Sequence, residues 1–250
     1  MSGSLDAAVV LAAGLGLRMR PLSETRPKPL VEVAGRTLLD RVVDRLVEAG
    51  VRRCVVNASW LGEQIAAWAP RRTDIALHVS MEDEPLETGG GVARALREKP
   101  DWFPTDRPVA VANGDALWLN GYEDALMRLQ RQWRPDVMDA LLLVHPTVSA
   151  YGYDGQGDFE MDADGRLTRR AAPMIAPFMF TGVQLLAPSV FADPPATAKY
   201  SLNVIYGAAA AADRLFGVRH DGAFFHVGTP ADLKVAESGL ADPNLGRPYF

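Results

Sequence analysis

Two glycines and two basic residues follow the first apolar run of the chain, residues 7–12. Gly14 and Gly16 come directly after this run, and Arg18 and Lys28 lie further along. Glycines after a strand let backbone N–H groups approach an anion closely, because no Cβ stands in the way. A proline on each side of Lys28 holds its backbone extended and gives its ammonium group a defined direction. The pattern predicts a phosphate-binding loop, with an ordinary glycine turn as the alternative.

The loop differs from the two common nucleotide-binding fingerprints. Met19 stands where a dinucleotide-binding loop has its third glycine, and no Gly-Lys-Ser/Thr follows as in a P-loop. The four histidines lack metalloprotease spacing, and no Gly-x-Ser-x-Gly elbow of a hydrolase is present. The sequence therefore favours a different class of phosphate chemistry.

Two further polar clusters follow apolar runs. Asn113 and Asp115 come directly after the run 109–112, where a parallel strand presents its carboxyl end to a ligand. Asn-Gly at 113–114 is also a common hairpin turn, which is the alternative. The acidic and glycine-rich segment 82–91 ends one expected strand and opens an expected helix. A nucleotide base could lie flat against that turn, or Thr88 could simply cap the helix.

Strands and helices alternate in the first half of the chain. Strands are expected at 7–12, 54–56, 75–79 and 109–112, and helices at 37–49, 61–68, 91–99 and 122–133. That order predicts parallel βαβ units. The second half is expected to add strands that cover the site, at 141–144, 157–161 and 178–186. Helices at 202–213 and 230–240 are expected to close the chain, with strands at 215–219 and 224–227 between them.

These elements predict an α/β fold, a single Rossmann-like domain with a mixed, mainly parallel central sheet. We expect one domain over 1–250. The net charge of −5 argues against nucleic acid as a partner. Cys54 is the only cysteine, and the apolar run 9–13 is far too short for a signal or membrane segment, so we expect a cytoplasmic protein with no membrane partner.

The loop sequence extends into a longer motif. Residues 11–21 read Leu-Ala-Ala-Gly-Leu-Gly-Leu-Arg-Met-Arg-Pro, and Pro-Lys-Pro-Leu follows at 27–30. This string resembles the signature of the sugar-1-phosphate nucleotidyltransferases. The resemblance implies the nucleotide-diphospho-sugar transferase fold, with an NTP and a sugar 1-phosphate as substrates and an NDP-sugar and pyrophosphate as products. It also implies a nucleotide-binding half at about 1–135 and a sugar-binding half at about 136–250. A nucleotide-sugar sensor without turnover is the non-catalytic alternative.

The resemblance also implies roles for the motif residues. Arg18 and the loop amides are expected to hold the triphosphate, and Lys28 to bridge the α-phosphate and the sugar phosphate. Asp115 is expected to bind Mg²⁺, which prefers oxygen ligands. Glu82 stands where relatives often have a glutamine that reads a pyrimidine edge. The implied nucleotide-binding set is Ala12, Ala13, Gly14, Gly16, Glu82, Thr88, Gly89 and Asn113.

His226 departs from the family pattern, which has an aspartate as second metal ligand before the Val-Gly-Thr turn. An imidazole suits Mn²⁺ or Co²⁺ better than Mg²⁺. Three roles stay open, since His226 could bind the metal directly, hold a metal-bound water or fill the turn. We expect Mg²⁺ as the cofactor, with Mn²⁺ or Co²⁺ as alternatives.

Several more restricted strings resemble the uridylyltransferases that act on N-acetylmuramate 1-phosphate in peptidoglycan recycling. They lie at 57–62, 85–91, 157–159, 180–182 and 227–230. Guanylyl transfer to mannose 1-phosphate is the alternative activity, and the protein is expected to be a monomer or a homodimer. Sugar contacts are expected from Gly152, Asp158, Thr181, Gly182 and Lys199.

For three of these residues an ordinary structural role is an equal alternative to sugar binding. Thr181 could be a strand hydroxyl, and Asp158 a turn carboxylate. Lys199 could pair with a sugar carboxylate such as a lactyl group, or be a solvated surface lysine.

Overall fold

A nine-stranded sheet runs through the whole molecule. The computed structural model describes residues 5–193, 198–243 and 245. The ends of the predicted domain, at 1 and 250, lie outside these residues. The strands of the sheet are β1 (Ala7–Leu11), β4 (Arg53–Ala58), β5 (Ala76–Met81), β6 (Val109–Asn113), β8 (Ala140–Pro146), β9 (Phe159–Met161), β10 (Leu167–Arg169), β11 (Phe178–Leu186) and β12 (Leu215–Arg219).

The sheet is mixed and mainly parallel, as predicted. Strand β1 lies between β4 and β6, with β5 beyond β4, and all four strands are parallel. Strand β11 pairs antiparallel with β6 and with β8, and β12 pairs parallel with β8. Strands β8, β9 and β11 thus extend the sheet, because β11 pairs along the open edge of β6 and with β8 and β9. The expectation that they cover the site was wrong.

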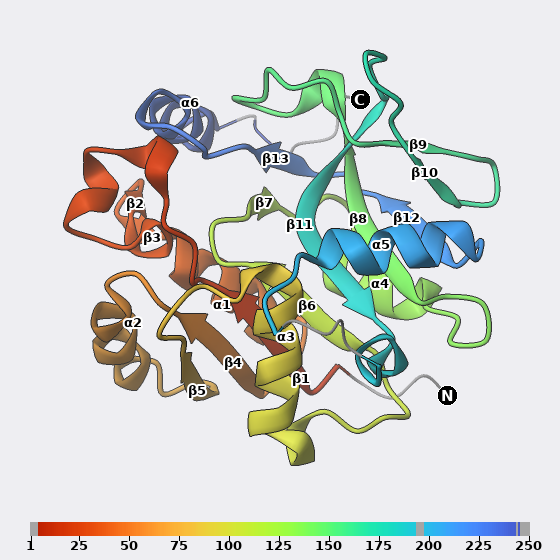
Figure 1. Cartoon of the computed structure of the whole chain (residues 1–250). Coiled ribbons are helices and arrows are strands. Elements are labelled where there is room, and N and C mark those ends of the chain that lie inside the picture. The colour runs from red at the N-terminus through yellow and green to blue at the C-terminus, as the bar shows by residue number, and fades with distance from the viewer. Residues whose placement is uncertain (1–4, 194–197, 244, 246–250) are drawn as a thin grey trace.

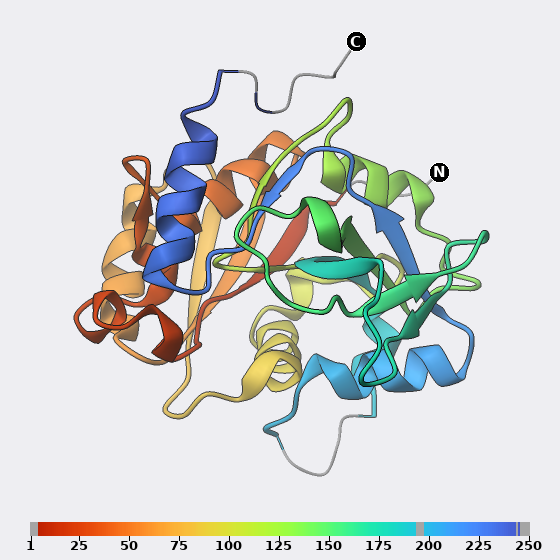
Figure 2. The ribbon, with the colours of Figure 1, turned by 90° about the horizontal axis from the view of Figure 1, so that it is seen from above.

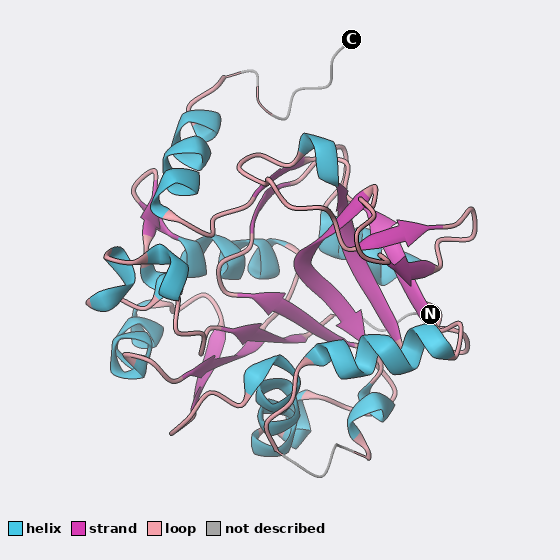
Figure 3. Cartoon of the chain, turned by 45° about the horizontal axis from the view of Figure 1, so that its top comes forward, coloured by secondary structure: helices cyan, strands magenta, loops and turns pink. Residues whose placement is uncertain are grey.

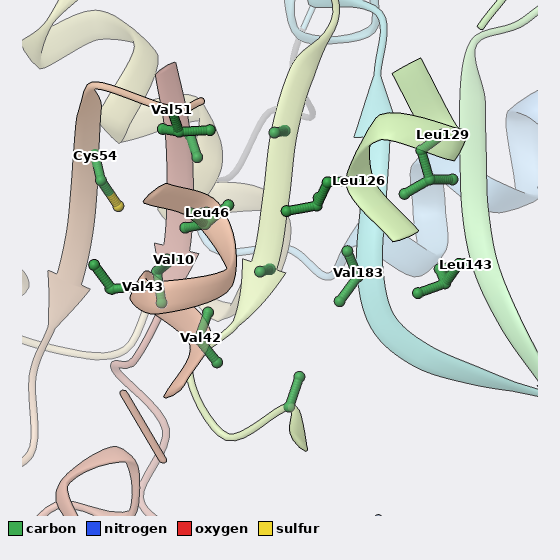
Figure 4. Packing of buried hydrophobic residues seen from close by; sticks show 14 of the residues in the cluster. Val10, Val42, Val43, Leu46, Val51, Cys54, Leu126, Leu129, Leu143 and Val183 are labelled. Carbon is green, nitrogen blue, oxygen red and sulfur yellow. The ribbon is translucent and has the colours of Figure 1, made fainter. Parts of the chain in front are cut away.

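Helices pack on both faces of the sheet (Figures 1 and 3). On one face lie α1 (Leu38–Glu48), α2 (Gly62–Trp68) and α4 (Ala125–Gln132), and on the other α3 (Glu87–Glu98) and α5 (Leu202–Ala211). The apolar positions of α1 recur at helical spacing, so one stripe faces the sheet. Figure 4 shows α1, with Val42, Val43 and Leu46, over the strands that carry Val10 and Cys54, and all five residues belong to one apolar cluster.

Two small two-stranded sheets lie outside the main sheet. Strand β7 (Leu117–Leu119) pairs antiparallel with β13 (Ala223–Phe225), and β2 (Glu32–Val33) pairs with β3 (Arg36–Thr37). Helix α6 (Pro230–Leu240) lies beside the β2–β3 hairpin (Figure 2). A separate apolar cluster binds these pieces together, and its members include Met19, Leu38, Leu117, Phe225 and Ala236.

Two helices begin several residues away from their predicted starts. Helix α4 begins at Ala125, because the Asp124 carboxylate caps it by accepting the amide N–H of Met127. Helix α3 begins at Glu87, earlier than the predicted 91, and its N-cap is Leu86. Thr88 is therefore not the cap of α3. Its hydroxyl accepts the N–H of Leu202 at the start of α5, 2.8 Å away.

The sheet crosses the boundary that we predicted between two halves of the chain, because β11 pairs with β6. The assignment of a nucleotide half and a sugar half stays a prediction. Among the described residues, no helix is both long and apolar enough to cross a lipid bilayer.

Two buried histidines lie side by side at the end of β8. His145 is 4% exposed and His220 is 1% exposed, and their ring centroids are 5.7 Å apart. Nε2 of His145 lies 3.2 Å from the Ser149 hydroxyl, and Nδ1 has no hydrogen-bond partner among the described residues. Burial, with a smaller contribution from His220, lowers the pKa of His145 to about 4. Burial also lowers the pKa of His220.

We expect this pair to make stability depend on pH. Below its usual pKa of about 6.5, a histidine in the unfolded chain takes up a proton. Folded His145 does so only near its pKa of about 4, so the stability falls as pH drops through this window. Between pH 7 and 5 the loss from His145 should be about 2 kcal/mol. Urea unfolding at both pH values should show a smaller difference for His145→Gln than for wild type, and equal differences would contradict the assignment.

Candidate active site

The ends of β1 and β6 define the crevice where the predicted site residues gather. Leu11 and Asn113 are register partners, and the N–H of Gly114 donates to the Leu11 carbonyl at 2.8 Å. In the sheet the chain continues in opposite directions from these two strands, because β4 follows β1 on one side whereas the strands after β6 lie on the other side, where β11 pairs with β6. Such a reversal in an open α/β sheet leaves a crevice outside the carboxyl ends of the strands.

A cavity of about 510 Å³ lies at this edge of the sheet. Its lining combines the loop after β1, the first turn of α3 and the loop after β6. The residues of the predicted site that line it are Ala12, Ala13, Gly14, Gly16, Arg18, Lys28, Thr88, Asn113 and Asp115, joined by Asn57, Pro85, Glu87 and Gly228. The structure thus brings together residues from distant parts of the chain.

The loop after β1 requires a glycine at position 16. Gly16 has φ +61°, in the left-handed region, and a Cβ built there would lie 3.0 Å from Cβ of Lys28. The Ser23 hydroxyl donates to the Gly16 carbonyl at 2.7 Å and holds the loop in place. The stem of Lys28 therefore packs directly against the loop.

Lys28 and Asp115 meet inside the cavity. The Lys28 ammonium donates to Oδ2 of Asp115, and the two side chains are 12% and 33% exposed. Lys28 opens the short helical turn Lys28–Leu30, so its own backbone is not extended as its flanking prolines predicted. The N-cap Pro27 is extended. Arg18 is exposed and lines the same cavity. The three predicted catalytic residues therefore share one space, with two cations and one anion around it.

The site offers one carboxylate ligand to a hard cation such as Mg²⁺. The Asp115 carboxylate lines the cavity, and Mg²⁺ commonly takes one or two carboxylates together with phosphate oxygens and water. Among the described residues no group of three or more His, Cys, Asp or Glu side chains is arranged to hold a metal ion. A metal here would need ligands from the substrate and from water.

His226 lies behind the cavity wall, with its ring edge-on to Tyr153 at a centroid distance of 5.4 Å. A Cβ built on Gly228, which lines the cavity, would be 2.7 Å from Nε2 of His226. His226 is not itself among the lining residues. Burial lowers its pKa, although Asp232 opposes this, and the lowered pKa favours the neutral imidazole that can bind metals. Its role as a ligand stays a prediction.

The turn at the start of α3 forms the far wall of the cavity through Pro85, Glu87 and Thr88. Glu87 has φ +60°, an unfavourable conformation for a residue with a side chain. Gly89 was expected to contact the nucleotide, but it does not line the cavity. Its N–H donates to the carbonyl of Tyr200 at 2.9 Å, and a Cβ built on it would lie 2.4 Å from the Tyr200 ring. This glycine serves close packing.

Glu82 is also placed differently from the prediction. It is 3% exposed and does not line the cavity. Its two oxygens accept hydrogen bonds from the Asn57 side chain and from the N–H of Leu86, both at 2.8 Å. A direct contact with the base is therefore not supported. Sequence reasoning assigned no role to Asn57, and the available signal was an asparagine at the end of a buried strand.

The residues expected to hold the sugar do not line this cavity. The Thr181 hydroxyl donates to the Leu143 carbonyl at 2.8 Å, and an Asp158 oxygen accepts the N–H of Phe180 at 2.8 Å. Both contacts match the structural alternatives considered for these residues. Lys199 is exposed.

Two glycines of the sugar set do approach the site. Gly182 has φ +85°, and a Cβ on it would lie 2.7 Å from Nδ2 of Asn113. Gly152 has φ +72°, and a Cβ there would lie 3.0 Å from the His226 carbonyl. Their roles in sugar binding stay predictions.

Comparison with known proteins agrees with this geometry. Residues 8–188 match the model of the MobA-like NTP transferase domain. The chain belongs to this family. Two relatives place it among the sugar-1-phosphate nucleotidyltransferases. N-acetylmuramate alpha-1-phosphate uridylyltransferase of Caulobacter vibrioides is 38% identical, over 97% of this chain and 100% of the relative. The protein of the same name from Neisseria meningitidis is 32% identical, over 92% and 96%.

Solved structures share the nucleotidyltransferase fold. UDP-glucose pyrophosphorylase from Acinetobacter baumannii superposes with a TM-score of 0.76 at 19% identity, covering 97% of this chain and 96% of that chain. The agreement in fold at this low identity confirms the predicted architecture. Like its relatives, this member of the family is a sugar-1-phosphate nucleotidyltransferase.

Proposed function

We propose that this enzyme transfers UMP from UTP to N-acetylmuramate 1-phosphate and releases pyrophosphate. One observation carries the proposal, namely that Arg18, Lys28 and Asp115 surround one cavity at the sheet crevice. The choice of substrates is supported by the two relatives, both named as uridylyltransferases of this sugar phosphate. A role in peptidoglycan recycling and a cytoplasmic location belong to the same proposal.

In this reaction an oxygen of the sugar phosphate attacks the α-phosphorus of UTP. The new P–O bond forms as the bond to the β-phosphate breaks, and pyrophosphate leaves with the electron pair. The attacking oxygen is already an anion, so no general base is needed. Catalysis then depends on positioning and on neutralising charge, which we assign to Arg18, Lys28 and the loop amides.

Lys28 has a specific part in this proposal. Its ammonium group contacts Asp115 within the cavity, and an incoming phosphate would compete with that carboxylate for it. A divalent cation held by Asp115 would neutralise phosphate charge on the other side. Binding of the substrates would thus break the ion pair that Lys28 and Asp115 form in the free enzyme.

The first test is a pyrophosphate-release screen of four NTPs against several sugar 1-phosphates. UTP with N-acetylmuramate 1-phosphate should give the highest kcat/KM. Guanylyl transfer to mannose 1-phosphate is the competing activity, and a tenfold preference for that pair would exclude our substrate assignment. Nucleotide binding without turnover for any pair would favour the sensor alternative.

Replacing Lys28 by methionine removes the charge and keeps the stem that packs against the loop at Gly16. A lost charge contact at a transferring phosphoryl group costs about 3 kcal/mol, so kcat should fall about a hundredfold. The melting temperature should stay close to that of wild type. Arg26→Met is the matched control, because Arg26 is half-exposed and pairs with Glu32 outside the cavity. Normal turnover of Lys28→Met would remove Lys28 from the reaction.

The third test concerns metal preference. Should His226 bind the metal or a metal-bound water, activity with Mn²⁺ or Co²⁺ should equal or exceed that with Mg²⁺. His226→Asp should shift the preference toward Mg²⁺, measured as the ratio of kcat/KM values for the ions. A His226→Ala variant with wild-type ratios for all three ions would instead assign the imidazole a purely structural role.

A further inference from the structure

A buried chain of hydrogen bonds runs beneath the cavity from the loop after β1 to the turn before α3. The Ala12 N–H donates to Oδ1 of Asn57 at 2.6 Å, and Nδ2 of Asn57 donates to Oε1 of Glu82 at 2.8 Å. Oε2 of Glu82 then accepts the N–H of Leu86 at 2.8 Å. We call these four groups the Asn57–Glu82 relay. It crosses the carboxyl ends of three adjacent strands, β1, β4 and β5.

The relay is almost fully shielded from water. Ala12 and Asn57 are each 2% exposed, and Glu82 is 3% exposed. Gly91 of α3 leaves room for it, because a Cβ at that position would lie 2.5 Å from Nδ2 of Asn57 and 3.1 Å from Oε1 of Glu82. Buried polar groups are costly unless they are paired, and each of the three N–H donors here has an acceptor. The orientation of the Asn57 amide is fixed by its two different partners.

The ends of the relay lie in two walls of the same cavity. Ala12 belongs to the loop that carries Gly14, Gly16 and Arg18, whereas Leu86 precedes Glu87 and Thr88. In the proposed function the first wall meets the triphosphate and the second meets the nucleoside. A rigid link between the walls sets the distance that one NTP molecule has to span.

We propose that Asn57 and Glu82 are positioning residues that hold the phosphate loop and the nucleoside turn in register for NTP binding. This inference rests on the proposed function in so far as one NTP contacts both walls. Glu82 acts through the relay and not through contact with the base, because it does not line the cavity and its two oxygens accept hydrogen bonds from Asn57 and Leu86.

Glu82→Gln breaks the relay at one link. Glutamine keeps one accepting oxygen and replaces the other by an NH₂ group, which would face either Nδ2 of Asn57 or the N–H of Leu86. The dissociation constant for NTP should rise at least about tenfold, as expected for loss of a hydrogen bond to a charged group. The ratio of UTP to GTP affinity and the KM for the sugar phosphate should not change. Glu84→Gln, the same substitution at an exposed neighbour, is the control.

The decisive test exchanges the amide and the carboxylate between positions 57 and 82. Asn57→Asp alone places two carboxylates face to face and should weaken NTP binding as much as Glu82→Gln. In the double variant Asn57→Asp/Glu82→Gln, the aspartate accepts from Ala12 and from the glutamine NH₂ group, and the glutamine oxygen accepts from Leu86. All three hydrogen bonds are restored, so affinity should return to within about threefold of wild type, given the usual worth of such bonds.

Affinities are measured by calorimetry with UTP and GTP, and folding by thermal unfolding. Recovery in the double variant supports the relay, also where a single variant fails to fold. Wild-type affinity in both single variants, no recovery in the double variant, or an altered UTP to GTP ratio in Glu82→Gln would overturn it. A wild type that prefers GTP would contradict the proposed substrate alone, because the variants are then compared with GTP.

Discussion

Strand β1 pairs in parallel with both β4 and β6, and the position of the site follows from this arrangement. From β1 the chain moves outward to β4 and β5, and then returns past β1 to form β6. Parallel crossovers are right-handed, so a reversal of direction places the next helix on the opposite face. This is why α1 and α2 share one face while α3 lies on the other. The crevice at the reversal receives loops from both directions.

The reversal leaves the walls of the cavity on separate pieces of chain. The loop after β1 and the turn before α3 belong to different βαβ units, and packing of apolar side chains alone sets their separation only loosely. Hydrogen bonds are directional and short, so a buried chain through Asn57 and Glu82 fixes the separation more closely. The same constraint accounts for Gly91, since any side chain there would occupy the space of the Asn57 amide.

The sequence predicted those features that depend on a local pattern. It did not predict those that depend on contacts with a distant segment of the chain. Lys28 and Asp115 were placed together correctly, because each follows from a motif next to a strand end. The surroundings of Thr88 and Gly89 could not be read locally, since their partners are the amide of Leu202 and the carbonyl of Tyr200. Strand β7 was missed for the same reason, as this three-residue strand exists only through its pairing with β13.

The turn that follows β13 bears on the change from aspartate to His226. Asp232 of α6 accepts the N–H groups of Gly228 and Thr229 at 2.9 and 2.8 Å, and Thr229 caps the helix in return. These bonds hold Gly228 at the cavity whatever residue occupies position 226. The imidazole lies close against Gly228, because a Cβ there would come within 2.7 Å of its Nε2 and the ring would have to shift. A change of side chain at 226 can therefore alter the chemistry behind the cavity wall while the capping bonds of α6 preserve the turn.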